Sequence, residues 1–238
     1  MYDLYLARGR VLGRLDGPVR MTQKDEVVKR VLLTGATGFI GRHCLAPLLS
    51  AGYEIHAIAS RVRLPEMQSV KWHRVDLLNL SEHDALLSRI EPTHLLHLAW
   101  YAEHGKYWSS MQNVDWVQAS LGLFSAFAKH GGRRVVVAGT CAEYSWEYGY
   151  CSENLTPLAP STLYGVCKDS LRRVLLAATA QSEMSAAWGR IFLLYGPYEH
   201  PSRLVSSVAT SVLAKREALC SHGAVSYTHL TLPTILRV

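Results

Sequence analysis

The chain has 238 residues, and 49% of them are hydrophobic, which is enough for one domain with a sizeable core. The formal net charge is +6, but the basic residues are scattered, which favours an anionic small molecule over nucleic acid as the partner. No apolar run approaches the roughly 20 residues of a membrane span, and the five cysteines include no C-x-x-C pair, so neither a zinc site nor a disulfide framework is expected.

Residues 1–28 carry no strong periodicity, and Arg8, Arg10 and Arg14 interrupt any apolar core of a signal peptide. Met21 stands just before the first periodic segment and would make a sensible start. We therefore expect residues 1–28 to be an N-terminal extension, with its first part a tail or upstream translation. We also expect a cytoplasmic protein with reduced thiols.

Short apolar runs alternate with helix-like segments from residue 29 onward. We expect strands at 29–35, 54–60, 70–76, 93–99, 133–140 and 186–196. We expect helices at 39–51, with Gly52 as its stop; at 81–92, with Ser81 as its cap; and at 107–130, 160–180 and 202–216. This alternation predicts a doubly wound α/β fold, in which helices cover both faces of a parallel sheet.

A glycine loop, "TGATGFIG", follows the first expected strand and opens the first expected helix. Gly35 would permit a tight turn, Gly38 a close approach to a pyrophosphate, and Gly41 close packing of the helix on the sheet. The spacing is G-x-x-G-x-x-G, so a purely structural turn is the alternative. If the loop binds a dinucleotide, its contacts are Gly35, Thr37, Gly38, Phe39, Ile40 and Gly41.

The end of the second strand bears on the choice of dinucleotide. No carboxylate stands there to bind a ribose 2′-OH, whereas Ser60 and Arg61 suit a 2′-phosphate, so we favour NADP over NAD. The alternative is that Arg61 is a solvated loop residue. Asp76 would accept from the adenine amino group or cap the next segment. Further expected contacts from strand ends are Leu77, Leu98 and Ala99.

Three polar residues form the candidate catalytic set. Tyr164 and Lys168 are four residues apart on an expected helix, so their side chains share a face. A nearby ammonium would lower the pKa of the phenol and make it a usable acid or base. Thr140 ends the fifth strand, where ligands of open α/β sheets bind, and could hydrogen-bond a reacting oxygen.

Four stretches together resemble the extended short-chain dehydrogenase/reductases of the NAD-dependent epimerase/dehydratase type: "TGATGFIG", "HLLHLAW", "VVVAGTCAEY" and "LYGVCK". The resemblance covers about residues 29–220. It implies that Tyr164 is the general acid/base, that Lys168 binds the nicotinamide ribose and tunes Tyr164, and that Thr140 positions the substrate oxygen. It also implies a nucleotide-activated sugar as substrate, and a homodimer through the helices around 107–130 and 160–180.

Two departures from the family pattern narrow the expected chemistry. Family dehydratases often carry an acidic pair after the catalytic threonine, but here Cys141 and Ala142 follow, which favours a 4-ketoreductase or an epimerase. Trp116 stands where family members often have an asparagine. The aromatic stretch 100–108 would contact the nicotinamide or sugar, or would only pack a loop, and His97 is expected in the core beside the cofactor.

The C-terminal stretch does not resemble the family. We expect residues 29–220 to hold the NAD(P)-binding domain and the start of a substrate lobe, and residues 221–238 to be a truncated or foreign tail. The incomplete lobe leaves two alternatives to an active enzyme. The chain would be a non-catalytic dinucleotide-binding module, or an inactive fragment of such an enzyme.

Overall fold

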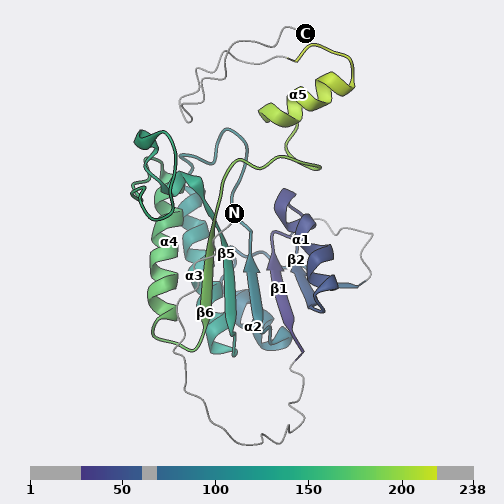
Figure 1. Cartoon of the computed structure of the whole chain (residues 1–238). Helices are drawn as coiled ribbons and strands as arrows, with labels where there is room; N and C mark the ends of the chain where they lie inside the picture. The colour runs from purple at the N-terminus through teal and green to yellow at the C-terminus, as the bar shows by residue number, and fades with distance from the viewer. Residues whose placement is uncertain (1–27, 61–68, 219–238) are drawn as a thin grey trace, which may run out of the picture.

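Six parallel strands form a single sheet in the computed structural model, which describes residues 28–60 and 69–218 (Figure 1). The strands are β1 (Arg30–Thr34), β2 (Glu54–Ile58), β3 (Val70–His73), β4 (His94–His97), β5 (Arg134–Thr140) and β6 (Ser185–Ile191). Their order across the sheet is β3-β2-β1-β4-β5-β6, and every neighbouring pair is parallel. The order reverses direction between β1 and β4, which confirms the doubly wound α/β fold and places the expected ligand crevice there.

Helices cover the two faces of the sheet unequally. The larger core cluster joins the sheet to α2 (Ser81–Ile90), α3 (Gln112–Lys129) and α4 (Leu163–Thr179) on one face. The smaller cluster joins it to α1 (Phe39–Ser50) on the other face. Figure 1 shows α5 (Leu204–Leu213) beyond the carboxyl ends of the strands, away from both layers. Two short 3-10 helices, η1 (Cys141–Glu143) and η2 (Trp146–Tyr148), follow β5.

The core follows the predicted periodicity of the helices. On α3, the inward positions Ser120, Leu123, Phe124 and Phe127 are buried, and Trp116 packs partly buried against the same cluster. On the opposite face, Leu45 of α1 is buried against β1 and β2. The alternation of strand and helix was therefore sufficient to predict the layers.

Several boundaries differ from those expected: the strands expected at 54–60, 70–76 and 186–196 end earlier, and the helices expected at 160–180 and 202–216 are shorter. Two further differences have a local cause. The helix expected from residue 107 begins at Gln112, because residues 100–108 form an aromatic loop instead of a helical turn. Leu80, not Ser81, is the N-cap of α2, and the Ser81 hydroxyl donates to Asn79 Oδ1 at 2.8 Å. The expectations for residues 1–27, for Arg61 and for residues 221–238 fall outside the described residues.

Membrane spans and metal-ligand clusters are both absent from the described part of the chain. No helix in it is both long enough and apolar enough to cross a bilayer. In residues 28–60 and 69–218, no three side chains of His, Cys, Asp or Glu are grouped as metal ligands.

The glycine loop takes the shape that its sequence predicts. Gly35 has a φ of 71°, in the left-handed region that favours glycine, and its backbone lies against Leu98 and Ala99 after β4. A Cβ on Gly41 would lie 2.1 Å from the Gly35 carbonyl oxygen. The first turn of α1 therefore packs on the loop at a distance that only a glycine allows.

We expect Gly41→Ala to lower the free energy of unfolding by about 1–3 kcal/mol or more, because the new methyl group would overlap the Gly35 carbonyl. The matched control is Gly189→Ala on β6, where a Cβ would meet open space. Urea unfolding of both variants measures the difference. Equal stability of the two variants would contradict the close packing of α1 on the loop.

Candidate functional site

The ends of β1 and β4 are joined by the hydroxyl of Thr34. Its Oγ1 accepts from the backbone amides of Leu98 and Ala99, both at 3.1 Å, and the three residues border Gly35. Leu98 and Ala99 therefore lie beside the glycine loop, as their place at a strand end predicts. Whether they contact a cofactor stays a prediction.

A chain of buried hydrogen bonds extends from Thr34 into α3. The Thr34 hydroxyl accepts two amides, so its own proton goes to His97 Nδ1, 2.8 Å away. His97 Nε2 then carries the ring proton and donates to Ser120 Oγ at 2.9 Å, and Ser120 donates to the Trp116 carbonyl at 2.6 Å. Burial lowers the pKa of His97 to about 3, which keeps this tautomer neutral. His97 is thus a core residue, as expected, and it links Thr34 of β1 to α3. Its place beside a cofactor stays a prediction.

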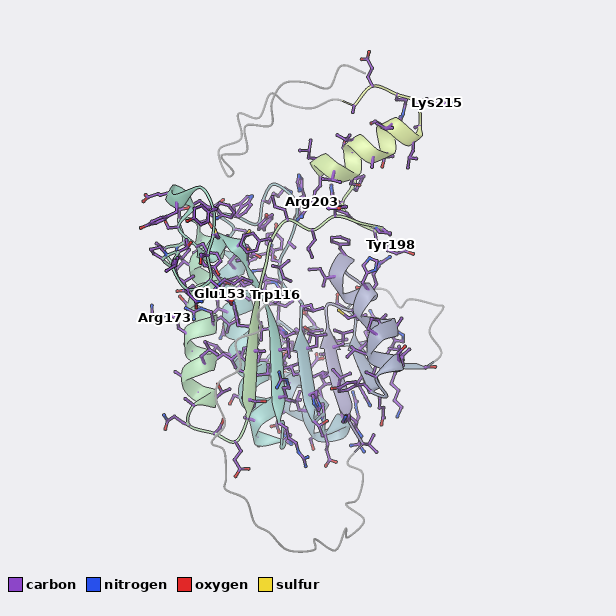
Figure 2. The ribbon with its side chains drawn as sticks, viewed as in Figure 1. Trp116, Glu153, Arg173, Tyr198, Arg203 and Lys215 are labelled. Atoms are coloured by element: carbon purple, nitrogen blue, oxygen red, sulfur yellow. The ribbon has the colours of Figure 1, made fainter. Side chains whose placement is uncertain are left out.

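The N-terminus of α1 is suited to an anion. Gly38 is its N-cap and offers no side-chain cap, and the first turn contains no acidic residue. Arg42 donates to the Thr37 carbonyl at 2.8 Å, and its guanidinium lies 4.2 Å from the centre of the Tyr198 ring. Figure 2 shows Tyr198 beside this end of α1. These groups fit the pyrophosphate of a dinucleotide.

The loop after β6 closes over the same helix end. His43 Nε2 hydrogen-bonds the Pro197 carbonyl at 3.0 Å, and the Phe39 ring lies edge-on to His43. Ile40 is half-buried, and its carbonyl accepts from the Cys44 thiol. Residues from β1, α1 and the segment after β6 therefore surround the glycine loop.

The residues expected to select the dinucleotide are only partly described. Ser60 is exposed after β2, with no carboxylate beside it in the sequence, and Arg61 lies outside the described residues. Asp76 is exposed, and its Oδ1 accepts from the Leu78 amide at 3.0 Å. This capping role is the second of the two alternatives for Asp76. Leu77 is buried in the larger core cluster.

Thr140 and Tyr164 meet at the carboxyl end of β5. Thr140 is 7% exposed, and its side chain lies beside that of Tyr164, where hydrogen bonding between the two lowers the pKa of Tyr164 against the larger effect of burial. Thr162 caps α4 through its Oγ1, and the Tyr164 amide donates to the Trp108 carbonyl at 3.1 Å. The start of α4 is therefore fixed both by its own cap and by the aromatic loop.

Lys168 is the second buried member of the set. Its side chain is 3% exposed, its Nζ donates to the Ala138 carbonyl at 2.9 Å, and it lies 3.8 Å from the centre of the Trp100 ring. A carbonyl dipole and an aromatic face both stabilise an ammonium. The described partners of Nζ are thus on β5 and on the loop after β4.

The aromatic loop covers Tyr164. Its ring lies edge-on to Tyr107 at 5.0 Å, to Trp108 at 5.8 Å and to Trp100 at 6.5 Å between centroids. Asn113, buried at the start of α3, holds the loop by accepting from Trp100 Nε1 at 2.8 Å and donating to the Tyr107 carbonyl at 2.7 Å. The stretch 100–108 therefore packs against Tyr164 and Lys168 and leaves Tyr164 half-buried.

The structure corrects one expectation about this set. We expected Lys168 to lower the pKa of Tyr164, but burial raises the pKa of Tyr164 to about 12, and the Thr140 hydrogen bond offsets this only in part. Burial also lowers the pKa of Lys168 to about 7, so its stabilising charge is itself weakened. The phenol is therefore protonated at neutral pH.

Sequence analysis missed Glu143, a fully buried residue of η1. Its carboxylate accepts from the Thr140 amide at 2.8 Å, from Trp188 Nε1 at 3.0 Å and from Arg190 Nε at 2.9 Å. Thr140 and Glu143 stand three apart, and T-x-x-E is the signature of a capping box. The signal was therefore present in the sequence next to the candidate threonine.

The chain matches one protein-family model, described as the NAD dependent epimerase/dehydratase family, over residues 31–230. It is 27% identical over 186 residues to dTDP-6-deoxy-L-talose 4-dehydrogenase (NAD(+)) of Aggregatibacter actinomycetemcomitans, a match that covers 77% of this chain and 66% of the relative. It is 26% identical to UDP-glucose 4-epimerase of Bacillus subtilis (strain 168), with 81% of this chain and 64% of the relative covered.

Solved structures show the same likeness. UDP-glucose 4-epimerase of Thermus thermophilus in complex with NAD superposes with a TM-score of 0.69 at 25% identity, covering 79% of this chain and 63% of that chain. MoeE5, in complex with UDP-glucuronic acid and NAD, has a TM-score of 0.64 at 32% identity, covering 76% of this chain and 60% of that chain. The chain thus spans less than two thirds of the length of each of these relatives.

The buried Lys168 should make stability depend on pH. Its pKa falls from 10.5 to about 7 on folding, so between these values the unfolded chain binds a proton that the folded chain lacks. Stability from this residue therefore rises with pH across that window, by about 1 kcal/mol per pH unit. Urea unfolding at pH 7.5 and 9.5 should show a rise in the wild type that Lys168→Met lacks.

The control for this measurement is Lys129→Met, because Lys129 is 65% exposed on the surface of α3. It should keep the wild-type rise with pH. If Lys168→Met kept the same rise as well, the buried environment of Lys168 would be wrong.

Proposed function

The chain belongs to the NAD dependent epimerase/dehydratase family, and from this premise we propose that it transfers a hydride between a nicotinamide cofactor and a nucleotide-activated sugar. The observation that carries the proposal is the close approach of the Thr140 and Tyr164 side chains at the carboxyl end of β5, beside the buried Lys168. This pair lies on the same edge of the sheet as the glycine loop after β1. Tyr164 is the general acid/base, and Thr140 positions the reacting oxygen.

The proposed reaction is reduction of a ketone at sugar carbon 4. When bound, a reduced nicotinamide supplies a hydride to the carbonyl carbon. The Tyr164 phenol donates its proton to the carbonyl oxygen, so the C=O bond becomes a C–H and an O–H bond, and the phenolate then regains a proton from solvent. Thr140 orients that oxygen, and Lys168 holds the cofactor ribose with its amine.

The protonation of the resting site favours reduction over oxidation. A phenol with a pKa of about 12 is a proton donor at neutral pH, which ketone reduction requires, whereas oxidation of an alcohol requires the phenolate.

Epimerisation is the second candidate. The Bacillus subtilis and Thermus thermophilus relatives are UDP-glucose 4-epimerases, and an epimerase would return the hydride within one cycle. Net consumption of reduced cofactor with a nucleotide-linked 4-keto sugar separates the two reactions. The names of these relatives also support a nucleoside diphosphate sugar as the substrate class.

We propose NADP as the preferred dinucleotide, with NAD accepted. Ser60 at the end of β2 gives a 2′-phosphate a hydrogen-bond donor and no negative charge, and Arg61 follows it in the sequence. Relatives are named with NAD, namely the Aggregatibacter dehydrogenase and the Thermus complex. The choice therefore rests on the residues after β2.

We also propose a homodimer that works in the cytoplasm. The exposed face of α3 and α4 carries Val114, Val166 and Val174, each 44–49% exposed, which suits a helix-to-helix contact between two copies. Cys44, Cys141, Cys151 and Cys167 are free thiols, which suits a reducing compartment.

Tyr164→Phe should lower kcat by roughly 10²–10⁴-fold, because it removes the proton donor and keeps the ring. NADPH affinity, measured by fluorescence titration, should stay unchanged. The control is Tyr53→Phe, at the opposite edge of the sheet before β2, which should keep full turnover. Full turnover by Tyr164→Phe would contradict the role of Tyr164 as general acid/base, whereas a full biological effect of this variant without turnover would support a non-catalytic dinucleotide-binding module.

Ser60→Asp should weaken NADPH binding by roughly tenfold or more relative to NADH, because a carboxylate repels the 2′-phosphate and accepts a 2′-hydroxyl. Ser60→Asn, which adds similar volume without charge, is the matched control. Fluorescence titration of both cofactors measures the ratio. A wild type that binds NADH more tightly than NADPH would overturn the NADP preference.

A further inference from the structure

Glu143 is a carboxylate in an unusual position. Its side chain is 0% exposed, although a buried carboxylate is costly unless it is fully paired and hydrogen-bonded. Two guanidiniums face it, Arg190 with Nε at 2.9 Å and Arg172 with Nε at 3.8 Å, and Trp188 Nε1 reaches both of its oxygens at 3.0 and 3.1 Å. The described contacts therefore satisfy both oxygens.

We propose that Glu143 is a positioning residue of the catalytic site, which aims the Thr140 hydroxyl at Tyr164 and balances the charge behind the site. This inference rests on the proposed function. It arises from the contacts of Glu143 with β5, β6 and α4, none of which involves solvent.

The geometry of Thr140 carries the first half of the proposal. Its amide donates to Glu143 Oε1 at 2.8 Å, and its Oγ1 accepts from the Ala142 amide at 3.2 Å. Together these bonds form a capping box that fixes the backbone and the side chain of Thr140. The hydroxyl proton is then left for the side chains that it meets, Tyr164 and Cys141.

Arg172 and Arg190 connect Glu143 to two neighbouring elements, α4 and β6. Arg172 lies on α4, one turn after Lys168, and is also bonded to Asp169 at 2.6 Å. Arg190 lies on β6 and donates to the Tyr144 hydroxyl at 3.2 Å. Glu143 thus ties the end of β5 both to β6 and to the helix that bears Tyr164 and Lys168.

The second half of the proposal, that Glu143 balances the charge behind the site, rests on its ion pairs. Two carboxylates, Glu143 and Asp169, balance two guanidiniums, so the cluster behind the site is neutral. The charge of Glu143 raises the pKa of Lys168 and also that of Tyr164. Neutralising Glu143 would leave a net positive charge beside both groups and lower both pKa values.

Other charged or titratable groups face the pair and remain in place when Glu143 changes. Those nearest to Tyr164 and Lys168 are Tyr107 after β4, Cys141 in η1 and His97 on β4; Tyr107 is in turn faced by Arg203, and Cys141 by Cys151. None of them contributes a second carboxylate to the site. These groups are the same in the wild type and in the Glu143 variants, so a shift of the kcat/KM pH profile in a variant should come from Glu143.

Two variants separate position from charge. Glu143→Asp keeps the charge but is one methylene too short to reach the Thr140 amide. We expect it to lower kcat roughly 10- to 100-fold with KM unchanged, and to leave the pH profile in place. Glu143→Gln keeps the length but removes the charge, so every limb of its kcat/KM profile should move to lower pH.

The matched control is Asp169→Asn. It removes a carboxylate bonded to the same Arg172, but this carboxylate does not contact Thr140. It should keep the wild-type kcat, because the Thr140 amide stays bonded to Glu143. Its pH profile should move less than that of Glu143→Gln, because Glu143 and not Asp169 acts on the pKa of Tyr164 and Lys168. If both Glu143 variants matched Asp169→Asn in kcat and in pH profile, the positioning role would be wrong.

Hydrogen exchange tests the placement of Thr140 without any substrate. The Thr140 amide should exchange faster in Glu143→Asp than in wild type or Asp169→Asn, because its acceptor is withdrawn. If the wild type turned over no nucleotide-linked 4-keto sugar, this result would contradict the proposed function but not the placement of Thr140 by Glu143. An unchanged Thr140 amide in Glu143→Asp would overturn the positioning role, whatever the activity.

Discussion

The burial of Lys168 between the Ala138 carbonyl and the Trp100 ring constrains the rest of the site. An amine that is 3% exposed must find its partners in the protein, and these partners lie on β5 and on the loop after β4. One side chain therefore joins α4 to two neighbouring strand ends at the point where ligands bind in this fold. Tyr164, one turn earlier on the same helix, is placed by the same contacts.

This burial shifts the pKa values of both Lys168 and Tyr164. Burial disfavours an ammonium on Lys168 and a phenolate on Tyr164, so both groups move toward their neutral forms. A neutral phenol held by a threonine is prepared to give a proton, not to take one. Opposed shifts in a pair of neighbouring groups are typical of functional sites, where environment assigns the acid and the base.

The arrangement of strands and helices could be predicted because apolar runs and amphipathic segments alternate along most of the chain. The glycine loop could be placed because three glycines stand at the first strand-to-helix turn. The direction of the Tyr164 shift could not be predicted, because it depends on how residues 100–108 fold over the ring. The sequence allowed these residues to pack a loop but not the ring that they would contact, because their polar anchor, Asn113, lies in the next helix.

Glu143 shows a different limit. Its place three residues after Thr140 indicated a capping box, but its charge partners come from β6 and α4, and no local pattern links them to η1. Asp76 illustrates the reverse case, because the sequence allowed two roles and the Leu78 amide now occupies one of its oxygens. Local signals predicted which backbone groups would be capped, whereas long-range packing determined which charges would meet.

The most direct test of the central claim, that Tyr164, Thr140 and Lys168 form one reducing site, is isotope transfer. The chain would be incubated with NADPH or NADH deuterated at the transferable position of nicotinamide C4, together with a nucleotide-linked 4-keto sugar, and the sugar product analysed by mass spectrometry. The account predicts one deuterium at sugar carbon 4. Bound cofactor with no deuterium in the sugar would contradict it.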